Sequence, residues 1–210
     1  MDCRYNSTYI NGGKVMYNLD FKDGVSLIED ETIDLVFTDP PYPKSYMYLY
    51  DYLADYCPRV MKHGASLLTI VPHYALEQVM DKFRGKLKYR WVICMNQFTG
   101  SHPRMAMGIE VMWKPILWYV KGSYPSGRGF LRDGIEITNT AGQTKPSGHK
   151  WEQSLDWCMY YIEKLTKEDD LVLDPYMGSG TVAVACKLLN RRFIGFEIDK
   201  EYYDIAITRT

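Results

Sequence analysis

The chain has 210 residues, of which 46% are hydrophobic, 24% charged and 14% aromatic. This length and composition predict a single globular domain over residues 1–210, and they exclude the disordered and fibrous classes. The formal net charge is −1 and the pI is near 6.4, so any contact with a polyanion has to come from a local basic patch.

Location and metal binding can be judged from apolar runs and cysteines. No stretch approaches the roughly 18 apolar residues of a membrane span, and the start, Met1 to Arg4, lacks the apolar region of a signal peptide. We therefore expect a soluble cytoplasmic protein without membrane contact. The five cysteines are odd in number and include no Cys-x-x-Cys pair, so we expect neither a disulfide scaffold nor a metal site.

Hydrophobic periodicity divides the chain into short strands and longer helices. Runs rich in Val, Ile, Leu, Phe or Trp predict strands at residues 34–38, 66–71, 90–96, 110–121, 171–174 and 192–197. Apolar residues three or four apart predict helices at residues 49–61, 73–85, 152–166, 179–190 and 200–209. This alternation is typical of an α/β fold, so we expect a mostly parallel sheet with helices on both faces.

The first expected strand is followed directly by the turn Asp39, Pro40, Pro41 and Tyr42. Two prolines predict a rigid turn at the carboxyl edge of the sheet, where open α/β sheets bind ligands. The Asp39 carboxylate and the Pro40 carbonyl are two acceptors that can hold both hydrogens of an exocyclic amino group. Tyr42 offers a ring on which a nucleobase can stack. The alternative is a proline turn with an aspartate cap.

Residues 121–150 interrupt the periodicity with six glycines and two prolines, which predicts a small inserted loop region. The segment contains five basic and two acidic residues, so its net charge is +3, whereas the whole chain has a net charge of −1. This is the local basic patch, and a solvated surface loop without a partner is the alternative. The basic residues are Lys121, Arg128, Arg132, Lys145 and Lys150.

The sharpest structural motif is a buried strand that runs through Asp174 into a glycine turn and then a helix. Glycines let the backbone approach a ligand closely, and the helix start offers unpaired N–H groups. Glu197 stands nineteen residues after Gly178, at the end of the next expected strand, placed to accept hydrogen bonds from both ribose hydroxyls of an adenosine. The alternative is a turn in which Gly178 and Gly180 are only structural.

The identity of the adenosine ligand follows from what the glycine turn lacks. No lysine follows the glycines, so a Walker phosphate loop is excluded, and the spacing is not that of a dinucleotide-binding turn. Asp174 at the strand end would repel a pyrophosphate. An adenosine without phosphates is therefore favoured, and S-adenosylmethionine fits that description.

Together the two motifs describe a methyl transfer. An amino nitrogen on a nucleobase is a poor nucleophile because its lone pair is delocalised into the ring, and acceptors on both N–H groups can redirect that lone pair. The sulfonium of S-adenosylmethionine supplies an electrophilic methyl, and in-line attack needs little beyond positioning and electrostatics. A duplex hides the amino group, so the base would have to be flipped out at a cost of roughly a few kcal/mol.

These residues resemble the DNA amino-methyltransferases, the family that methylates adenine N6 or cytosine N4, and specifically its permuted group. In that group the Asp-Pro-Pro-Tyr turn comes first, a target-recognition insertion follows, and the cofactor half comes last, as in this sequence. The resemblance implies a Rossmann-like methyltransferase fold with residues 39–42 as the catalytic turn. It also implies that residues 121–150 are a small target-recognition insertion whose five basic residues contact DNA.

The resemblance extends to the cofactor site. Asp20 stands nineteen positions before Asp39, where family members carry an acidic residue that contacts the cofactor adenine, and Phe21 lies beside it. The run 195–203 also resembles the family's ending. The implied cofactor-binding residues are Asp20, Phe21, Asp174, Pro175, Tyr176, Gly178, Ser179, Gly180, Thr181, Glu197 and Ile198.

The sequence thus predicts a prokaryotic or phage enzyme of restriction and modification that methylates adenine N6 in DNA. Adenine is favoured because the family's cytosine members more often carry Ser where this chain has Asp39. The alternatives are cytosine N4, an RNA amino group, or a catalytically silent subunit that binds nucleic acid. A protein methyltransferase acting on a Gln amide is disfavoured, since its similar turn usually begins with Asn. The sequence does not decide between a monomer and a homodimer.

Overall fold

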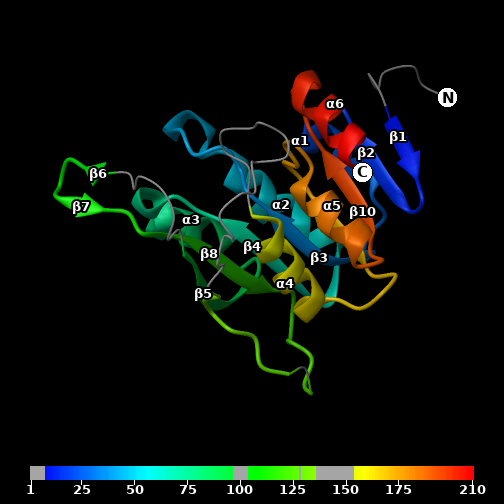
Figure 1. Cartoon of the computed structure of the whole chain (residues 1–210). Coiled ribbons are helices and arrows are strands. Elements are labelled where there is room, and N and C mark those ends of the chain that lie inside the picture. Colours follow the sequence, from blue (N-terminus) through cyan, green and yellow to red (C-terminus); the bar gives the residue numbers. More distant parts are fainter. Residues whose placement is uncertain (1–7, 97–103, 128, 136–153) are drawn as a thin grey trace.

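The computed structural model describes residues 8–96, 104–127, 129–135 and 154–210 (Figure 1). One mixed sheet holds eight strands in the order β1-β2-β10-β9-β3-β4-β8-β5. Its strands are β1 (Thr8–Asn11), β2 (Lys14–Tyr17), β3 (Ile33–Thr38), β4 (Met61–Ile70), β5 (Lys88–Asn96), β8 (Trp113–Val120), β9 (Leu171–Asp174) and β10 (Arg192–Phe196). A separate two-stranded hairpin holds β6 (Arg104–Met105) and β7 (Ile109–Glu110).

Helices cover both faces of the large sheet (Figure 1). One face packs on α4 (Leu155–Leu165), α5 (Thr181–Leu188) and α6 (Lys200–Arg209) in a core that includes Trp157, Phe37 and Tyr203. The other face packs on α1 (Phe21–Gly24), α2 (Leu49–Val60) and α3 (Leu76–Phe83) in a second core. Strands buried on both faces explain the nearly continuous apolar runs of β3, β4 and β9.

Most strand pairings in the sheet are parallel. Strands β2, β10, β9, β3 and β4 form a parallel set, whereas β1 is antiparallel to β2, and β8 is antiparallel to both β4 and β5. The prediction of a mostly parallel α/β sheet with helices on both faces is confirmed.

Strands β3 and β9 lie side by side, but the chain leaves them in opposite directions across the sheet. From β3 it crosses through α2 to β4, and from β9 it crosses on the other face through α5 to β10. Such a reversal opens a crevice at the carboxyl ends of the two strands, which is where open α/β sheets bind ligands.

Several expected boundaries were wrong. Residues 110–121 are not one strand, because the chain closes the β6–β7 hairpin at Glu110 before β8 begins at Trp113. Helix α5 starts at Thr181 rather than at residue 179, because Gly180 adopts a left-handed φ of 82°. The stretch from residue 73 begins as a 3-10 turn, His73–Ala75, before α3. Strands β1 and β2 and helix α1 were not predicted.

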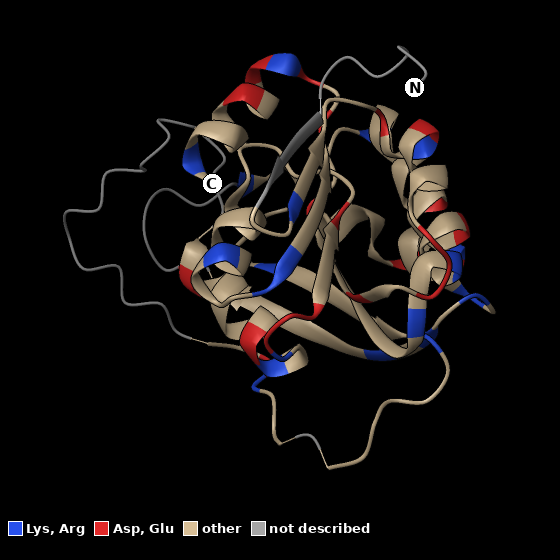
Figure 2. Ribbon diagram, turned by 90° about the vertical axis from the view of Figure 1, so that its right-hand side faces the viewer, with Lys and Arg blue, Asp and Glu red and all other residues tan. Residues whose placement is uncertain are grey.

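The surface carries charges of both signs. In Figure 2, Lys and Arg alternate with Asp and Glu along the helices of the side shown, in keeping with the formal net charge of −1. Among the described residues, no helix has the length and apolar character needed to cross a membrane.

Candidate active site

A cavity of about 910 Å³ lies at the carboxyl ends of β3, β9 and β10. Its walls come mainly from the turn after β3, the turn after β9 and the segment after β10. Tyr74 from the 3-10 turn before α3 and Lys114 from β8 also line it. The cavity brings together all the predicted catalytic and cofactor residues except Asp20, Phe21, Pro175 and Gly180. Residues that are far apart in the sequence therefore share one site.

The turn after β3 presents its polar groups to this cavity. Asp39 and Tyr42 are half-buried, while Pro40 between them is buried. The Tyr74 hydroxyl donates a hydrogen bond to the Tyr42 carbonyl and fastens the turn. The Lys114 ammonium lies 4.9 Å from the centre of the Tyr42 ring. Burial, together with the negative charge of Asp39 nearby, raises the pKa of the Tyr42 hydroxyl, which stays protonated.

Asp174 ends β9 at the floor of the cavity. Its carboxylate accepts hydrogen bonds from the Thr38 hydroxyl at 2.7 Å and from the Tyr176 backbone N–H at 3.1 Å. Burial raises the pKa of Asp174 to about 7, and these two hydrogen bonds limit the rise. The charges of Asp39 and Glu197 push the pKa in the same direction as burial. The pKa of Asp174 therefore lies well above that of an exposed aspartate.

The two glycines of the turn after β9 differ in what surrounds them. Gly178 has a φ of 50°, and a Cβ built on it would meet nothing within 4 Å, which leaves open space for a ligand. A Cβ on Gly180 would instead lie 2.9 Å from the Cβ of Ala206, so Gly180 lets α6 pack closely. The Arg209 guanidinium donates to the Ser179 carbonyl at 2.7 Å and to its hydroxyl at 2.9 Å, which holds the turn from below.

Glu197, directly after β10, is oriented by backbone donors. Its carboxylate accepts from the N–H of Gly178 at 2.9 Å and from the N–H of Asp199 at 2.8 Å. Burial raises the pKa of Glu197, and these hydrogen bonds oppose the rise. The Asn18 side-chain amide donates to the Glu197 carbonyl at 2.8 Å and fixes the segment. Each carboxylate oxygen keeps a second lone pair for a ligand hydroxyl.

The remaining predicted cofactor residues differ in accessibility. Ile198 lines the cavity with 70% of its surface exposed, so its side chain is accessible to a ligand there. Asp20 is the N-cap of α1 and accepts from the Lys22 N–H at 2.9 Å. Phe21 is buried and packs edge-on against the Tyr176 and Phe196 rings. Asp20 and Phe21 therefore stand behind the cavity wall rather than in it.

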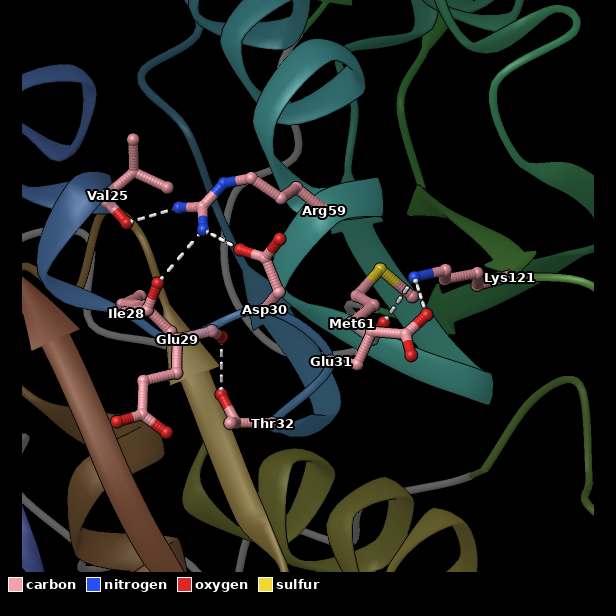
Figure 3. Close-up of polar contacts among 9 residues, drawn as sticks. All are labelled: Val25, Ile28, Glu29, Asp30, Glu31, Thr32, Arg59, Met61 and Lys121. Atoms are coloured by element: carbon pink, nitrogen blue, oxygen red, sulfur yellow. Dashed lines mark hydrogen bonds and ion pairs between the residues drawn. The ribbon is translucent and has the colours of Figure 1, made fainter.

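The structure does not bring Lys121 to the cavity. Strand β8 runs antiparallel to β4, so Lys121, just after its end, lies at the opposite edge of the sheet. There the Lys121 ammonium donates to the Glu31 carboxylate and to the Met61 carbonyl, each at 2.8 Å (Figure 3). The same edge holds Arg59 hydrogen-bonded to the Val25 carbonyl at 2.6 Å (Figure 3). Lys121 serves to join strands at this edge.

The other basic residues of the insertion are only partly described. Arg132 is exposed, and its backbone N–H and carbonyl bond to the hydroxyls of Tyr160 and Tyr161 on α4. This places Arg132 beside α4. Arg128, Lys145 and Lys150 lie outside the described residues.

Sequence reasoning missed several residues of the cavity wall. Lys114 and Tyr74 come from β8 and the 3-10 turn, and their contact with Tyr42 depends on tertiary packing. Met177 lies inside the glycine turn and was passed over because it is apolar. Tyr46 also lines the cavity, and its nearness to the catalytic turn in the sequence was the available signal.

The charges of the cavity fit a cationic ligand. Four carboxyl groups, Asp39, Asp174, Glu197 and Asp199, line it against two lysines, Lys44 and Lys114. The excess of acids attracts positive charge, while the exposed Ile198 and the open space at Gly178 suit an apolar ring and a close backbone contact. A sulfonium-bearing adenosine meets all three conditions.

One family model matches most of the chain, and curated relatives match it over different shares of its length. The N6/N4 methyltransferase family, described as DNA methylase, matches residues 33–208. The type II methyltransferase M.HpaI of Haemophilus parainfluenzae is 28% identical over 225 residues, covering 87% of this chain and 69% of that protein. M.HindIII of Haemophilus influenzae is 44% identical over 61 residues, covering 29% and 20%. The chain thus spans 20% to 69% of the length of these two relatives.

Solved structures share the fold. The complex of M1.HpyAVI with SAM has a TM-score of 0.74 and 26% identity, covering 93% of this chain and 98% of that one. The cytosine-N4-specific PvuII DNA methyltransferase has a TM-score of 0.83 over 98% of this chain and 90% of that one. Its identity is 17%, so this second likeness concerns the fold alone.

Proposed function

Because the chain belongs to the N6/N4 DNA methylase family, we propose that it transfers a methyl group from S-adenosylmethionine to adenine N6 in DNA. The family membership confirms the resemblance to the DNA amino-methyltransferases, and the family uses S-adenosylmethionine, while the permuted order of the motifs stays a prediction. The observation that carries the proposal is the shared cavity, in which the turn 39–42 faces the glycine turn and Glu197.

The chain's own residues position the amino group. Asp39 and the Pro40 carbonyl accept hydrogen bonds from its two N–H groups, which turns the nitrogen lone pair away from the base ring. Tyr42 stacks on the flipped base, and because its hydroxyl stays protonated it adds no negative charge beside Asp39. The Tyr74 hydrogen bond keeps the turn in place during this contact.

The cofactor is held by the glycine turn and the segment after β10. Glu197 would accept hydrogen bonds from the ribose hydroxyls, the exposed Ile198 would pack on the adenine, and the open space at Gly178 would let its backbone approach the cofactor. When bound, S-adenosylmethionine supplies an electrophilic methyl on a sulfonium. The acids of the cavity, Asp39 and Asp174 among them, favour that positive charge.

Adenine rather than cytosine is our choice of base, supported by the aspartate that opens the turn at residue 39. DNA contacts away from the cavity are proposed for Arg128, Arg132, Lys145 and Lys150 of the insertion, while the Lys121 ammonium is engaged at the far sheet edge. The silent-subunit alternative is disfavoured because the chain keeps both the catalytic turn and an intact cofactor cavity.

The test is one incubation with labelled S-adenosylmethionine and three acceptors: mixed-sequence DNA, RNA and free nucleotides. Nucleosides are then analysed by mass spectrometry. We expect label in methyladenine from DNA, loss of it in Asp39→Ala, and retention of it in Asp81→Ala, where the aspartate is exposed on α3. Label in methylcytosine would overturn the choice of base, and label in RNA alone would overturn the choice of substrate.

A further inference from the structure

The β6–β7 hairpin is built separately from the rest of the fold. Arg104 pairs with Glu110 and Met105 with Ile109, and the chain reverses through Ala106, Met107 and Gly108. Gly108 has a φ of 81°, and its N–H donates to the Met105 carbonyl at 2.9 Å. This is a three-residue turn with glycine at the left-handed position, and it places Met107 at the tip.

The apolar side chains of this hairpin face solvent. Every residue from 104 to 110 is exposed, and the exposed fractions are 42% for Met105, 78% for Met107 and 53% for Ile109. Met112, just after the hairpin, is 43% exposed. A two-stranded hairpin has no core of its own and gains little stability from such side chains in water. Clustered exposed apolar residues on a projecting element indicate a binding surface.

The hairpin stands at the edge of the sheet that holds the cavity. Strand β5 runs parallel to β3 and ends at this edge, and β8 starts from it, so the connection between them projects there (Figure 1). At the base of the hairpin, the Trp113 and His73 rings pack edge to face with their centres 4.8 Å apart. The Lys114 ammonium lies over the Tyr42 ring. The hairpin is thus anchored beside the catalytic turn.

We propose that Met107, flanked by Met105 and Ile109, is a wedge that enters the base stack of duplex DNA and fills the space left by the flipped target base. The inference rests on the proposed function, which requires the base to leave the duplex. Apolar side chains such as Met and Ile unstack bases in this way, and the flexible thioether adapts to an irregular gap. Lys44 and Lys114 line the active-site cavity, and their ammonium groups can bind the phosphates that flank the flipped base.

A second copy of the chain is a weaker occupant for this surface. A stable interface between proteins buries about 800 Å² on each partner, from roughly 20 to 30 residues. The hairpin offers seven exposed residues, 104 to 110, of which one is basic and one acidic. A narrow apolar tip suits insertion between base pairs better than such a broad contact.

The test compares the wild-type enzyme with Met107→Gln, which keeps the length of the side chain, and Met107→Leu, which keeps it apolar. Leu188→Gln, at the exposed end of α5, is the matched control. Each enzyme methylates one recognition site in two duplexes, with the target adenine either paired or opposite an abasic position. The readout is the ratio of kcat/KM on the paired duplex to kcat/KM on the unpaired one.

We expect Met107→Gln to lower this ratio about tenfold or more, because a paired base must be both unpaired and unstacked, whereas a base opposite an abasic position leaves the duplex more easily. Met107→Leu should restore most of the ratio, and Leu188→Gln should not change it. A second readout is the fluorescence of 2-aminopurine at the target position, which should rise on binding of wild type and rise less with Met107→Gln.

Three outcomes would overturn the wedge. They are an unchanged ratio with normal activity in Met107→Gln, an unchanged ratio because activity falls equally on both duplexes, and a fall that follows dissociation of a dimer in analytical ultracentrifugation. The last would assign the hairpin to a second copy of the chain. Failure of the proposed function looks different, since the wild-type enzyme would then methylate neither duplex.

Discussion

The hydroxyl of Thr38, at the end of β3, donates a 2.7 Å hydrogen bond to the carboxylate of Asp174, at the end of β9. Both side chains are buried, and they join the strand before the catalytic turn to the strand before the glycine turn. The bond lies where the sheet reverses its direction of crossing. It therefore links the two halves of the active site beyond the backbone pairing of β3 with β9.

Replacing Thr38 by Val should remove this bond without changing the size of the side chain much. A buried carboxyl that loses a hydrogen-bond donor costs about 1 to 3 kcal/mol of unfolding free energy. The loss can be measured by urea denaturation at pH 8. Thr208→Val, where the threonine is exposed on α6, should change the unfolding free energy far less, and an equal change in both variants would contradict the assignment.

The pKa of about 7 at Asp174 predicts a pH dependence of cofactor binding. The group is neutral below this pH and charged above it, and only the charged form attracts a sulfonium. The affinity for S-adenosylmethionine relative to the neutral product S-adenosylhomocysteine should rise several-fold from pH 6 to pH 8. Calorimetric titration of both ligands measures this ratio, and a ratio that rises equally in Asp174→Asn would assign the effect to another group.

The same shift predicts how Asp174 affects stability. Its pKa in the fold lies above the ordinary value of 3.8, so folding takes up a proton between these two values. The contribution of protonated Asp174 to the unfolding free energy is complete below about pH 4 and is lost as the pH rises through about 7. Without ligand, Asp174→Asn should therefore gain stability relative to wild type as the pH rises across this window. Thermal denaturation from pH 5 to pH 8 checks the sign.

The two glycines predict separate losses. Gly180→Ala places a methyl group 2.9 Å from the Ala206 Cβ at a φ of 82°, so it should cost about 1 to 3 kcal/mol of stability. Gly178→Ala meets no atom within 4 Å and should cost only the strain of its φ, about 1 kcal/mol. Its added methyl should instead weaken cofactor binding. The unfolding free energy and the cofactor affinity are measured for both variants. Equal losses of both quantities in the two variants would refute the distinction.

Ile198 predicts a change in binding without a change in fold. Because its side chain is 70% exposed, Ile198→Ser should leave the unfolding free energy within about 0.5 kcal/mol of wild type. Loss of the apolar contact with adenine should weaken S-adenosylmethionine and S-adenosylhomocysteine equally, by about tenfold. Unequal effects on the two ligands would place Ile198 near the sulfur instead.

Tyr42 separates stacking from hydroxyl chemistry. Tyr42→Ala should lower kcat/KM on DNA by about 10- to 100-fold, since stacking on a base contributes about 1 to 3 kcal/mol. Tyr42→Phe keeps the ring and should keep most of the activity, because the raised pKa leaves the hydroxyl without a charge to supply. A large loss in Tyr42→Phe would show that the hydroxyl itself acts in the reaction.

Local patterns predicted the centre of the sheet and the strands beside the cavity. β3 and β9 are short apolar runs that end in Asp39 and the glycine turn, and both signals are contained in a few adjacent residues. β2 pairs with β1 across Gly12 and Gly13, a local hairpin signal that was missed, whereas its other partner, β10, lies at the other end of the chain. Pairing partners of this kind leave no local trace.

Strand direction explains the remaining differences at the site. Residues 110–121 contain enough apolar side chains to suggest one strand, and nothing local shows that β8 returns antiparallel to β4. That direction sends Lys121 to the far edge and brings Lys114 to Tyr42. The hairpin at 104–110 arises from the same reversal, and no local pattern predicted its apolar tip.

The strand order also decides when this protein can fold. β2 and β3 leave the ribosome early, yet in the finished sheet they are separated by β10 and β9, which are synthesised last. Until then one apolar edge of β2 and one of β3 have no partner strand. In the finished sheet the space between them is filled by two strands, a width of about 10 Å. A chain stalled before β9 should stay sensitive to protease along its whole length, and release of the last strands should protect both halves at once.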